Sequence, residues 1–232
     1  IKLLHLVTEP TTNKKEQRSI KNLKDFCSST GIKYDMRVNK IWKELPPSNT
    51  CNRPQDIDYK PASIGNGFGK LTPGHYGCYL AHRNAICLED NKDYDFILVF
   101  EGDVIIDSDF KELYESLFRF NNIAYLENLD LVGFGNPPST TNIKGSKIQD
   151  VHCDVIPFVP AQSYLIPNKS INVWKEKLED KKWEAWDLWI MNIGQMKSGI
   201  ADKVYTKHLP GFSLVDQIEK NKDNDNPLIF TD

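Results

Sequence analysis

The chain has 232 residues, of which 40% are hydrophobic and 26% charged, and its formal net charge at pH 7 is −3. This composition fits a globular protein with a sizeable core, and it argues against a broad basic surface for nucleic acid and against the run of about 20 apolar residues that a transmembrane helix needs. Five cysteines without a C-x-x-C pair predict reduced thiols, and hence a cytoplasmic protein or one at the cytosolic face of a membrane.

The first part of the chain predicts a strand, a helix and a loop in turn. A short apolar strand at residues 3–7 precedes a helix that Asn13 can cap, with Glu16 three residues later, and Gly31 ends this helix. Residues 46–70 contain four prolines and a glycine cluster. The spacing of these glycines does not fit a phosphate-binding loop, so we interpret the segment as a loop.

The middle of the chain predicts the central strand of the fold. A helix is expected from Pro73, with one face formed by Cys78, Ala81, Ala85 and Leu88. Residues 96–100 are all apolar, which is typical of a strand buried on both faces of a sheet. Asp107 or Ser108 is expected to cap the next helix, and residues 129–135 predict another strand.

The last part predicts further α/β units. Residues 136–150 are polar and long enough to form a lid. Strand ends are expected at residues 158–159 and 164–166, and Pro167 precedes a helix whose apolar face holds Ile171, Trp174 and Leu178. A further helix carries Trp186, Trp189 and Ile190. No clean linker interrupts the chain, so we expect one α/β domain.

Two acidic residues follow the apolar strand directly, in the stretch Glu101-Gly102-Asp103. Residues i and i+2 of a strand point the same way, and a glycine between them permits a close approach of backbone or ligand. Buried carboxylates are costly unless something pairs with them, and oxygen ligands suit Mg²⁺ or Mn²⁺. The sequence therefore predicts a cation site here; the alternative is an edge turn whose two acids are solvated.

Residues 71–85, LTPGHYGCYLAHRNA, resemble the L-(S/T)-x-G-E-I-G-C-x-L-S-H segment of glycosyltransferase family 25. This family holds bacterial lipooligosaccharide (lipopolysaccharide) galactosyltransferases and procollagen galactosyltransferases. The acidic stretch stands where the family has E-D-D. Residues 161–166 and 186–217 resemble its (G/A)-x-x-A-Y-L-I and closing D-x-x-L…V-Y…P-x-L-x-x-Q segments. The chain departs from the family pattern at His75, where a glutamate is usual, and at Gly102, where an acid is usual.

The resemblance implies a single nucleotide-sugar-binding domain of the GT-A type over residues 1–232. Its fold class would be α/β, with a mixed, mostly parallel central sheet flanked by helices. The implied activity is an inverting glycosyl transfer that depends on Mn²⁺ or Mg²⁺. A hexose, galactose or glucose, would move from a nucleotide-diphospho-sugar, with a UDP-hexose as the expected donor, to a hydroxyl of a glycan or protein-linked acceptor. The donor and this acceptor are the expected partners.

The resemblance also implies roles for particular residues. The metal is expected to be held by Glu101, Asp103 and His208. The donor is expected to contact these two acids together with Thr8, Glu9 and His82. The alternatives are that His208 is an exposed loop residue and that His82 is structural.

A general base is expected in the closing segment, because an inverting transfer needs a group that takes the proton of the acceptor hydroxyl. Asp187 matches the family's acid there, and Glu184 is the second candidate. The neighbouring Trp183, Trp186 and Trp189 could offer flat apolar faces to a sugar ring. The alternative is that Trp186 and Trp189 belong to the core and that Asp187 is a charge at a helix start.

Two other functions use the same features of the sequence. A nucleotidyltransferase or metal phosphohydrolase would also place acids at a strand end, although it normally has more acids or a lysine-rich phosphate loop near the first strand. A non-catalytic carbohydrate-binding protein could keep the fold without turnover, and Gly102 in the acidic motif is the feature that favours this alternative.

Overall fold

The computed structural model of the protein describes residues 1–47, 51, 71–135, 146–153, 162–179 and 182–209. Most of the loop predicted at 46–70, the greater part of the lid predicted at 136–150, and the strand end predicted at 158–159 lie outside the described residues. None of the helices in the described part of the chain is long and apolar enough to cross a membrane.

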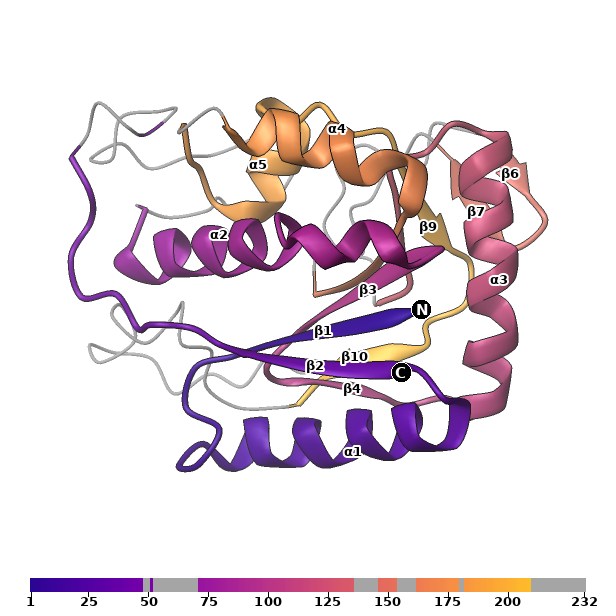
Figure 1. The fold of residues 1–232 in the computed structure, drawn as a ribbon, viewed down its shortest axis with the longest axis horizontal. Helices are drawn as coiled ribbons and strands as arrows, with labels where there is room; N and C mark the ends of the chain where they lie inside the picture. The colour runs from indigo at the N-terminus through magenta and orange to yellow at the C-terminus, as the bar shows by residue number, and fades with distance from the viewer. Residues whose placement is uncertain (48–50, 52–70, 136–145, 154–161, 180–181, 210–232) are drawn as a thin grey trace, which may run out of the picture.

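The described strands form one large sheet and one separate pair (Figure 1). The sheet order is β2-β1-β3-β8-β5-β9-β7-β6. Its strands are β1 (Lys2–Val7), β2 (Lys33–Val38), β3 (Phe96–Glu101), β5 (Leu131–Gly133), β6 (Lys147–Ile148), β7 (Val151–Cys153), β8 (Ser163–Pro167) and β9 (Ser198–Ala201). The separate antiparallel pair is formed by β4 (Val104–Ile106) and β10 (Thr206–His208).

The sheet is mixed, and most of its strands point the same way. β1 is parallel to β2 and β3, and β5 is parallel to β9. β8 runs antiparallel to both β3 and β5, and β7 runs antiparallel to both β9 and β6. Only β8 and β7 therefore oppose the common direction among the described strands. The predicted fold class, α/β with a mixed and mostly parallel sheet, is confirmed.

Helices cover both faces of this sheet (Figure 1). The helices are α1 (Lys14–Thr30), α2 (Pro73–Ile86), α3 (Phe110–Leu126), α4 (Asn168–Glu179) and α5 (Trp186–Asn192), with a short 3₁₀ turn, η2, at Glu89–Asp93. β3 lies between two buried cores, and its successive residues face one core and the other in turn. Ile97 and Val99 pack with α2, α4 and α5, whereas Phe96, Leu98 and Phe100 pack with α1 and α3. Such alternation explains why β3 is apolar throughout.

Helix α1 begins and ends as predicted, with one difference at its first turn. The Asn13 side chain accepts hydrogen bonds from the backbone N–H groups of Lys15 and Glu16, and Gly31 ends the helix with φ of 72°. A left-handed residue at this position favours glycine, which has no Cβ. The expected capping-box role of Glu16 is wrong, because its carboxylate turns instead to the loop that follows β1.

Helix α2 explains why a histidine can stand where family 25 has a glutamate. Thr72 is the N-cap, and its hydroxyl accepts from the backbone N–H of His75. His75 Nδ1 in turn lies 3.0 Å from the backbone nitrogen of Thr72, which donates to it. This is the reciprocal pair that a capping-box glutamate normally makes. Leu88, predicted to share the helix face, lies beyond the end of α2.

Three other predictions of local structure need correction. The N-cap of α3 is Asp109 rather than Asp107 or Ser108, because Asp109 Oδ1 accepts from the backbone nitrogen of Glu112 at 2.9 Å. The segment 136–150 was predicted to be loop, but its last part contains the short strand β6. Strand β2 was not predicted: its apolar and charged residues alternate, and they are partly or fully exposed, as is usual for a strand at the edge of a sheet.

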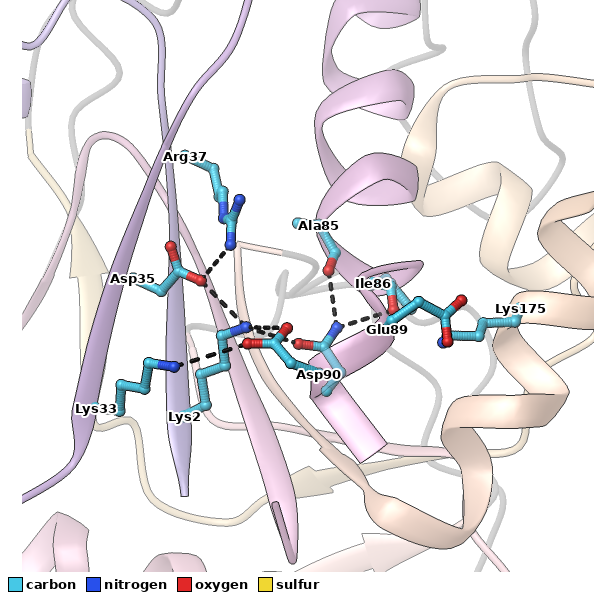
Figure 2. Close-up of polar contacts among 10 residues, drawn as sticks. Lys2, Lys33, Asp35, Arg37, Ala85, Ile86, Glu89, Asp90 and Lys175 are labelled. Atoms are coloured by element: carbon cyan, nitrogen blue, oxygen red, sulfur yellow. Dashed lines mark hydrogen bonds and ion pairs between the residues drawn. The ribbon is translucent and has the colours of Figure 1, made fainter. Parts of the chain in front are cut away.

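A buried lysine, Lys2, lies at the edge of the sheet where β1 and β3 begin and binds several charged and polar side chains there (Figure 2). We call this group the amino-edge cluster; its members are Lys2, Lys33, Asp35, Arg37, Asp90 and Asn91. Lys2 is fully buried, and its Nζ lies 2.8 Å from Asp90 Oδ1, 3.1 Å from Asp35 Oδ2 and 3.2 Å from Asn91 Oδ1. An ammonium group has three hydrogens to donate, so these three oxygens match its capacity.

Candidate metal centre and active site

The acidic stretch lies at the opposite edge of the sheet, in a turn rather than within a strand. β3 ends at Glu101, and Gly102 and Asp103 form the turn that leads into β4. The prediction that strand alternation aligns the two acids is therefore wrong. The turn nevertheless brings them together: ligand atoms of Glu101, Asp103 and His208 all lie within 4.8 Å of one another. We call these three residues the carboxyl-edge cluster.

Strand β10 delivers His208 to this cluster. Its pairing with β4 places His208 opposite Val104, the residue after Asp103. The backbone nitrogen of Leu209 donates to the carbonyl oxygen of Asp103 at 2.8 Å, and His208 Nδ1 lies 3.1 Å from Asp103 Oδ1. His208 is therefore not a loop residue remote from the acids, and two backbone contacts fix its position.

The cluster is electrostatically coupled. Burial alone would raise the pKa of Asp103, but the hydrogen bond and charge of His208, together with the charge of Lys15, hold the pKa below its ordinary value. Burial would lower the pKa of His208, and the hydrogen bond with Asp103 and the charges of Glu101 and Asp103 raise it instead. Lys15 Nζ lies 4.0 Å from Asp103 Oδ2. Each shift favours the charged form of its group, so the geometry stabilises opposite charges here.

Gly102 is required by its neighbours. A Cβ atom at this position would lie 2.9 Å from the carbonyl oxygen of Leu6 and 3.0 Å from Glu16 Oε1. The buried carboxylate of Glu16 accepts from the backbone nitrogens of Thr8 and Glu9 at 2.9 and 2.7 Å, and from the Thr8 hydroxyl at 2.8 Å. The glycine thus makes room for a carboxylate that fixes the loop after β1, and its presence has a structural cause.

The other side of Glu101 faces helix α2. Its Oε1 lies 3.3 Å from His82 Nε2 and 3.7 Å from Cys78 Sγ. His82 is 1% exposed, its Nδ1 lies 2.7 Å from the hydroxyl of Tyr164, and its ring stacks on Trp186 with centroids 4.6 Å apart. Burial lowers the pKa of His82 against the opposing effect of Glu101. A neutral, tightly packed His82 orients Glu101, and a donor contact by His82 stays a prediction.

The candidate bases lie at the start of α5. Asp187 is in the first turn and half-buried, and its charge raises the pKa of Cys78, after the larger effect of burial and that of Glu101. Asp187 therefore lies near the acidic turn. Glu184 is buried, and its Oε2 accepts from Asn192 Nδ2 at 3.2 Å.

The expectation that tryptophans next to Asp187 offer flat faces to a sugar is wrong. Trp183, Trp186 and Trp189 are 1%, 3% and 0% exposed. Trp186 and Trp189 stack on each other with centroids 5.2 Å apart, and Trp186 also stacks on Trp174 at 5.8 Å. Their aromatic faces are used within the core, where such stacking adds to the energy of burial.

The structure also shows neighbours of the acidic turn that the sequence did not indicate: Lys15 and Cys78 contact its two acids, and Glu16 lies beside Gly102. Tyr164 is held one step further away, through its bond to His82. The spacing of Cys78 and His82, four residues apart on one helix, could have suggested that both face the same neighbour. The contacts of Glu16 and Lys15 depend on where α1 packs, which no local pattern predicts.

The fold and this cluster define an α/β protein with acidic and imidazole side chains gathered where the central parallel strand β3 ends. Residues 42–144 match the family described as Glycosyltransferase family 25 (LPS biosynthesis protein). The match covers α2 and the acidic turn, and it confirms both the resemblance and the enzyme class predicted from it, a glycosyltransferase. The closing segment that contains Asp187 and His208 lies beyond the matched residues, so its resemblance stays a prediction.

Solved structures that resemble this chain include several transferases. One is the galactosyltransferase LgtC in complex with donor and acceptor sugar analogs, with 12% identity, coverage of 91% of this chain and 87% of that one, and a TM-score of 0.43. Another is a Drosophila beta-1,4-galactosyltransferase 7 in complex with manganese, UDP-Gal and xylobiose, with 10% identity, coverage of 97% and 76%, and a TM-score of 0.43.

A third is a mannose-1-phosphate geranyltransferase from Thermus thermophilus, with 9% identity, coverage of 89% of this chain and 75% of that one, and a TM-score of 0.46. Similarities this low carry no argument about activity. No curated protein sequence matches the chain.

Proposed function

We propose that the chain is a metal-dependent, inverting glycosyltransferase. It moves a hexose, galactose or glucose, from a nucleotide-diphospho-sugar such as a UDP-hexose to a hydroxyl of a glycan or protein-linked acceptor, within one domain of residues 1–232. The observation that supports this most strongly is the convergence of Glu101, Asp103 and His208 at the carboxyl edge of the sheet, where open α/β sheets bind ligands.

The carboxyl-edge cluster has the right donor set for Mn²⁺ or Mg²⁺. Two carboxylates and one imidazole lie within reach of a common point, and such ions combine a few protein ligands with water and phosphate oxygens. Asp103 and His208 would hold the ion together with Glu101. When bound, the ion would supply Lewis-acid stabilisation of the negative charge that develops on the diphosphate leaving group.

Lys15 and the loop after β1 would act on the donor directly. Lys15 lies 4.0 Å from Asp103, so its ammonium group can approach phosphate oxygens bound at the same edge. Thr8 and Glu9, held by Glu16, would position the nucleoside. Fixing these groups before the donor binds lowers the entropy that binding costs.

Asp187 would serve as the general base that takes the proton of the acceptor hydroxyl, with Glu184 as the second candidate. Asp187 is half-buried and its charge acts on Cys78, which in turn contacts Glu101, so it lies near the metal ligands without belonging to the carboxyl-edge cluster. Such separation is what an inverting transfer needs, because the base and the leaving group act on opposite sides of the sugar carbon.

A panel of nucleotide sugars tests the proposal. The purified chain is incubated with each sugar and Mn²⁺, with Mg²⁺, or with EDTA, and release of the free nucleoside diphosphate is measured with and without glycan acceptors. We expect release with a UDP-hexose and a divalent ion, stimulated by acceptor and lost in EDTA.

Other outcomes would identify the alternatives. Release of pyrophosphate from a nucleoside triphosphate and a sugar phosphate would indicate a nucleotidyltransferase. Release of inorganic phosphate from phosphate esters would indicate a phosphohydrolase. Glycan or donor binding in calorimetry without any turnover would indicate a non-catalytic carbohydrate-binding protein.

We also propose a cytoplasmic location, or one at the cytosolic face of a membrane, where nucleotide sugars are available. All five cysteines are free thiols in the structure. Fractionation of the producing cells, with the protein detected in cytosol and washed membranes, tests this location. Recovery only from an oxidising compartment would contradict it.

A further inference from the structure

A second group of ligand atoms lies on the other side of Glu101 from Asp103 and His208. Cys78 and His82 are one turn apart on α2, so both side chains project from the same face of the helix toward the end of β3. Cys78 Sγ, His82 Nε2 and a carboxylate oxygen of Glu101 all lie within 4.8 Å of one another. The donor set is therefore sulfur, nitrogen and oxygen, in contrast to the carboxyl-edge cluster.

The two distances from Glu101 in this group match the edges of a metal-centred tetrahedron. Bonds of about 2.3 Å to sulfur and about 2.0 Å to nitrogen and oxygen give ligand-to-ligand edges of roughly 3.3 to 3.6 Å. Glu101 Oε1 lies 3.3 Å from His82 Nε2 and 3.7 Å from Cys78 Sγ. The three atoms could close around a zinc-sized ion with only small movements of their side chains.

The surroundings hold the imidazole in the orientation that a ligand needs. The Tyr164 hydroxyl, 2.7 Å from Nδ1, and the stacked ring of Trp186 fix His82 so that Nε2 faces Cys78 and Glu101. Histidines that bind metals commonly have their second nitrogen fixed by such a partner, which sets the tautomer and the ring orientation. Both contacts are buried, so this orientation does not depend on solvent.

We propose that Cys78, His82 and Glu101 form a binding site for a thiophilic divalent ion of the zinc class, separate from the Mn²⁺ or Mg²⁺ site proposed at Asp103 and His208. A thiolate and an imidazole favour Zn²⁺, Co²⁺ or Cd²⁺ over Mg²⁺ and Mn²⁺. On binding, the thiol proton of Cys78 is released to solvent and the sulfur forms the bond to the metal. Water supplies the remaining ligand.

Glu101 links the two sites, and this sharing gives the site a regulatory consequence. A carboxylate drawn toward Cys78 and His82 is less available to Asp103 and His208, so zinc would weaken the binding of Mn²⁺ and inhibit transfer. This consequence rests on the proposed function, whereas the binding of zinc itself does not.

Cobalt spectroscopy tests the site without any sugar substrate. Co²⁺ is titrated into the metal-free full-length chain and the absorption is recorded. We expect a thiolate-to-cobalt charge-transfer band in the near ultraviolet together with the visible bands of a tetrahedral ion, both removed by Zn²⁺. The bands should be absent in Cys78→Ser and retained in Cys87→Ser, a matched control in which a half-buried cysteine at the end of the same helix is changed.

A second measurement uses the unchanged chain, so it holds even if the variant folds poorly. The rate of alkylation at Cys78 is followed by peptide mass spectrometry with and without Zn²⁺. We expect Zn²⁺ to slow alkylation of Cys78 at least about tenfold and that of Cys87 little. Cobalt bands absent from the wild type or retained in Cys78→Ser, or unchanged alkylation of Cys78, would overturn the proposal and show that hydrogen bonds alone hold the three side chains together.

The variant Asp103→Asn separates this proposal from the proposed function. It removes a ligand of the carboxyl-edge cluster only, so the cobalt bands should persist while Mn²⁺ binding weakens. Loss of both in Asp103→Asn would mean that one site binds both ions, which would also overturn the inference.

Discussion

The two edges of the central sheet both gather charged side chains, and they do so in different ways. At the amino edge, the fully buried Lys2 has three acceptors for its three hydrogens, and the cations Lys33 and Arg37 add to the same group. At the carboxyl edge, the carboxylates of Glu101 and Asp103 lie together, and His208 and Lys15 are the basic groups that contact Asp103. In the first group the buried ammonium of Lys2 is matched by its acceptors, whereas we propose that the second group binds a cation.

This difference suggests a general criterion. A buried charge whose donors are matched in number by acceptors has its partners within the fold and needs no ligand. A group of carboxylate and imidazole side chains gathered at the carboxyl ends of strands is, by contrast, where a ligand is expected to bind. Variants at the carboxyl edge should therefore change binding and turnover, and variants at the amino edge should change stability.

The largest effect is expected at Asp187. Asp187→Asn keeps the shape and removes the proton acceptor, so transfer should fall by roughly 10²- to 10⁴-fold while the donor dissociation constant changes little. Rates and binding constants of this variant and of Glu184→Gln check the assignment. Normal glycosyl transfer with a lowered melting temperature in Asp187→Asn would show that Asp187 is only a charge at the helix start. Glu184 would then become the candidate general base.

Lys2→Met should produce the largest loss of stability. Removing the buried ammonium group leaves Asp35 and Asp90 close together without it, and breaking a buried ion pair typically costs about 3 to 5 kcal/mol. Urea denaturation measures this loss, and Mn²⁺ affinity should be unaffected. Lys33→Met is the control: this lysine is 55% exposed and lies 3.7 Å from Asp90, so its loss should change stability by no more than about 0.5 kcal/mol.

Asp103→Asn should affect turnover rather than folding. Loss of one electrostatic stabiliser of a leaving group typically lowers the rate by roughly 10²- to 10³-fold, and Mn²⁺ binding measured by calorimetry should weaken in parallel. Asp107→Asn is the matched control. Asp107 follows the end of β4, is half exposed, and lies 2.6 Å from Lys207 of β10, so it does not belong to the carboxyl-edge cluster. Equal activity of the two variants would refute the metal centre.

The smallest effect concerns His5, a buried histidine bonded to hydroxyl groups rather than to carboxylates. Its Nδ1 lies 2.7 Å from the Tyr34 hydroxyl and its Nε2 3.1 Å from Ser19 Oγ. Burial lowers the pKa of His5 from 6.5 to about 4, although the backbone carbonyls of Gly102 and Glu101 and the charge of Asp103 oppose the shift.

The pKa of His5 predicts how stability depends on pH. Between pH 6.5 and 4 the histidine is protonated in the unfolded chain and neutral in the folded chain. The free energy of unfolding therefore decreases as the pH drops from 6.5 toward 4. The loss at pH 4.5 should be about 2 to 3 kcal/mol relative to pH 7. His5→Gln does not titrate, and its acid sensitivity in urea denaturation should be smaller by this amount. The same acid sensitivity in both proteins would show that other groups are responsible.

The sequence predicted the elements that have strong local patterns. The apolar run of β3, the caps of α1 and the apolar face of α4 are set by neighbours in the chain, and the structure contains all three. Strand β2 was missed although Tyr34, Met36 and Val38 alternate with charged residues, a local pattern that does predict a strand.

The site was predicted only in part, because its geometry depends on long-range packing. Asp103 and Glu101 were named correctly as neighbours, but a turn rather than strand alternation brings them together. His208 reaches Asp103 across 105 residues through the pairing of β10 with β4, which no local spacing reveals. The tryptophans near Asp187 were assigned to a sugar-binding surface, but they are buried. The sequence alone does not distinguish aromatic residues that pack in a core from those that line a pocket.

The contact between Gly102 and Glu16 has a consequence for how this site can change. An aspartate placed at position 102 would collide with the Leu6 carbonyl and with the carboxylate that holds the loop after β1. A smaller residue at position 16 would remove only the second of these contacts, because the first is with backbone. Any side chain at position 102 therefore requires the acidic turn to move away from the end of β1, and the glycine allows the two to pack closely.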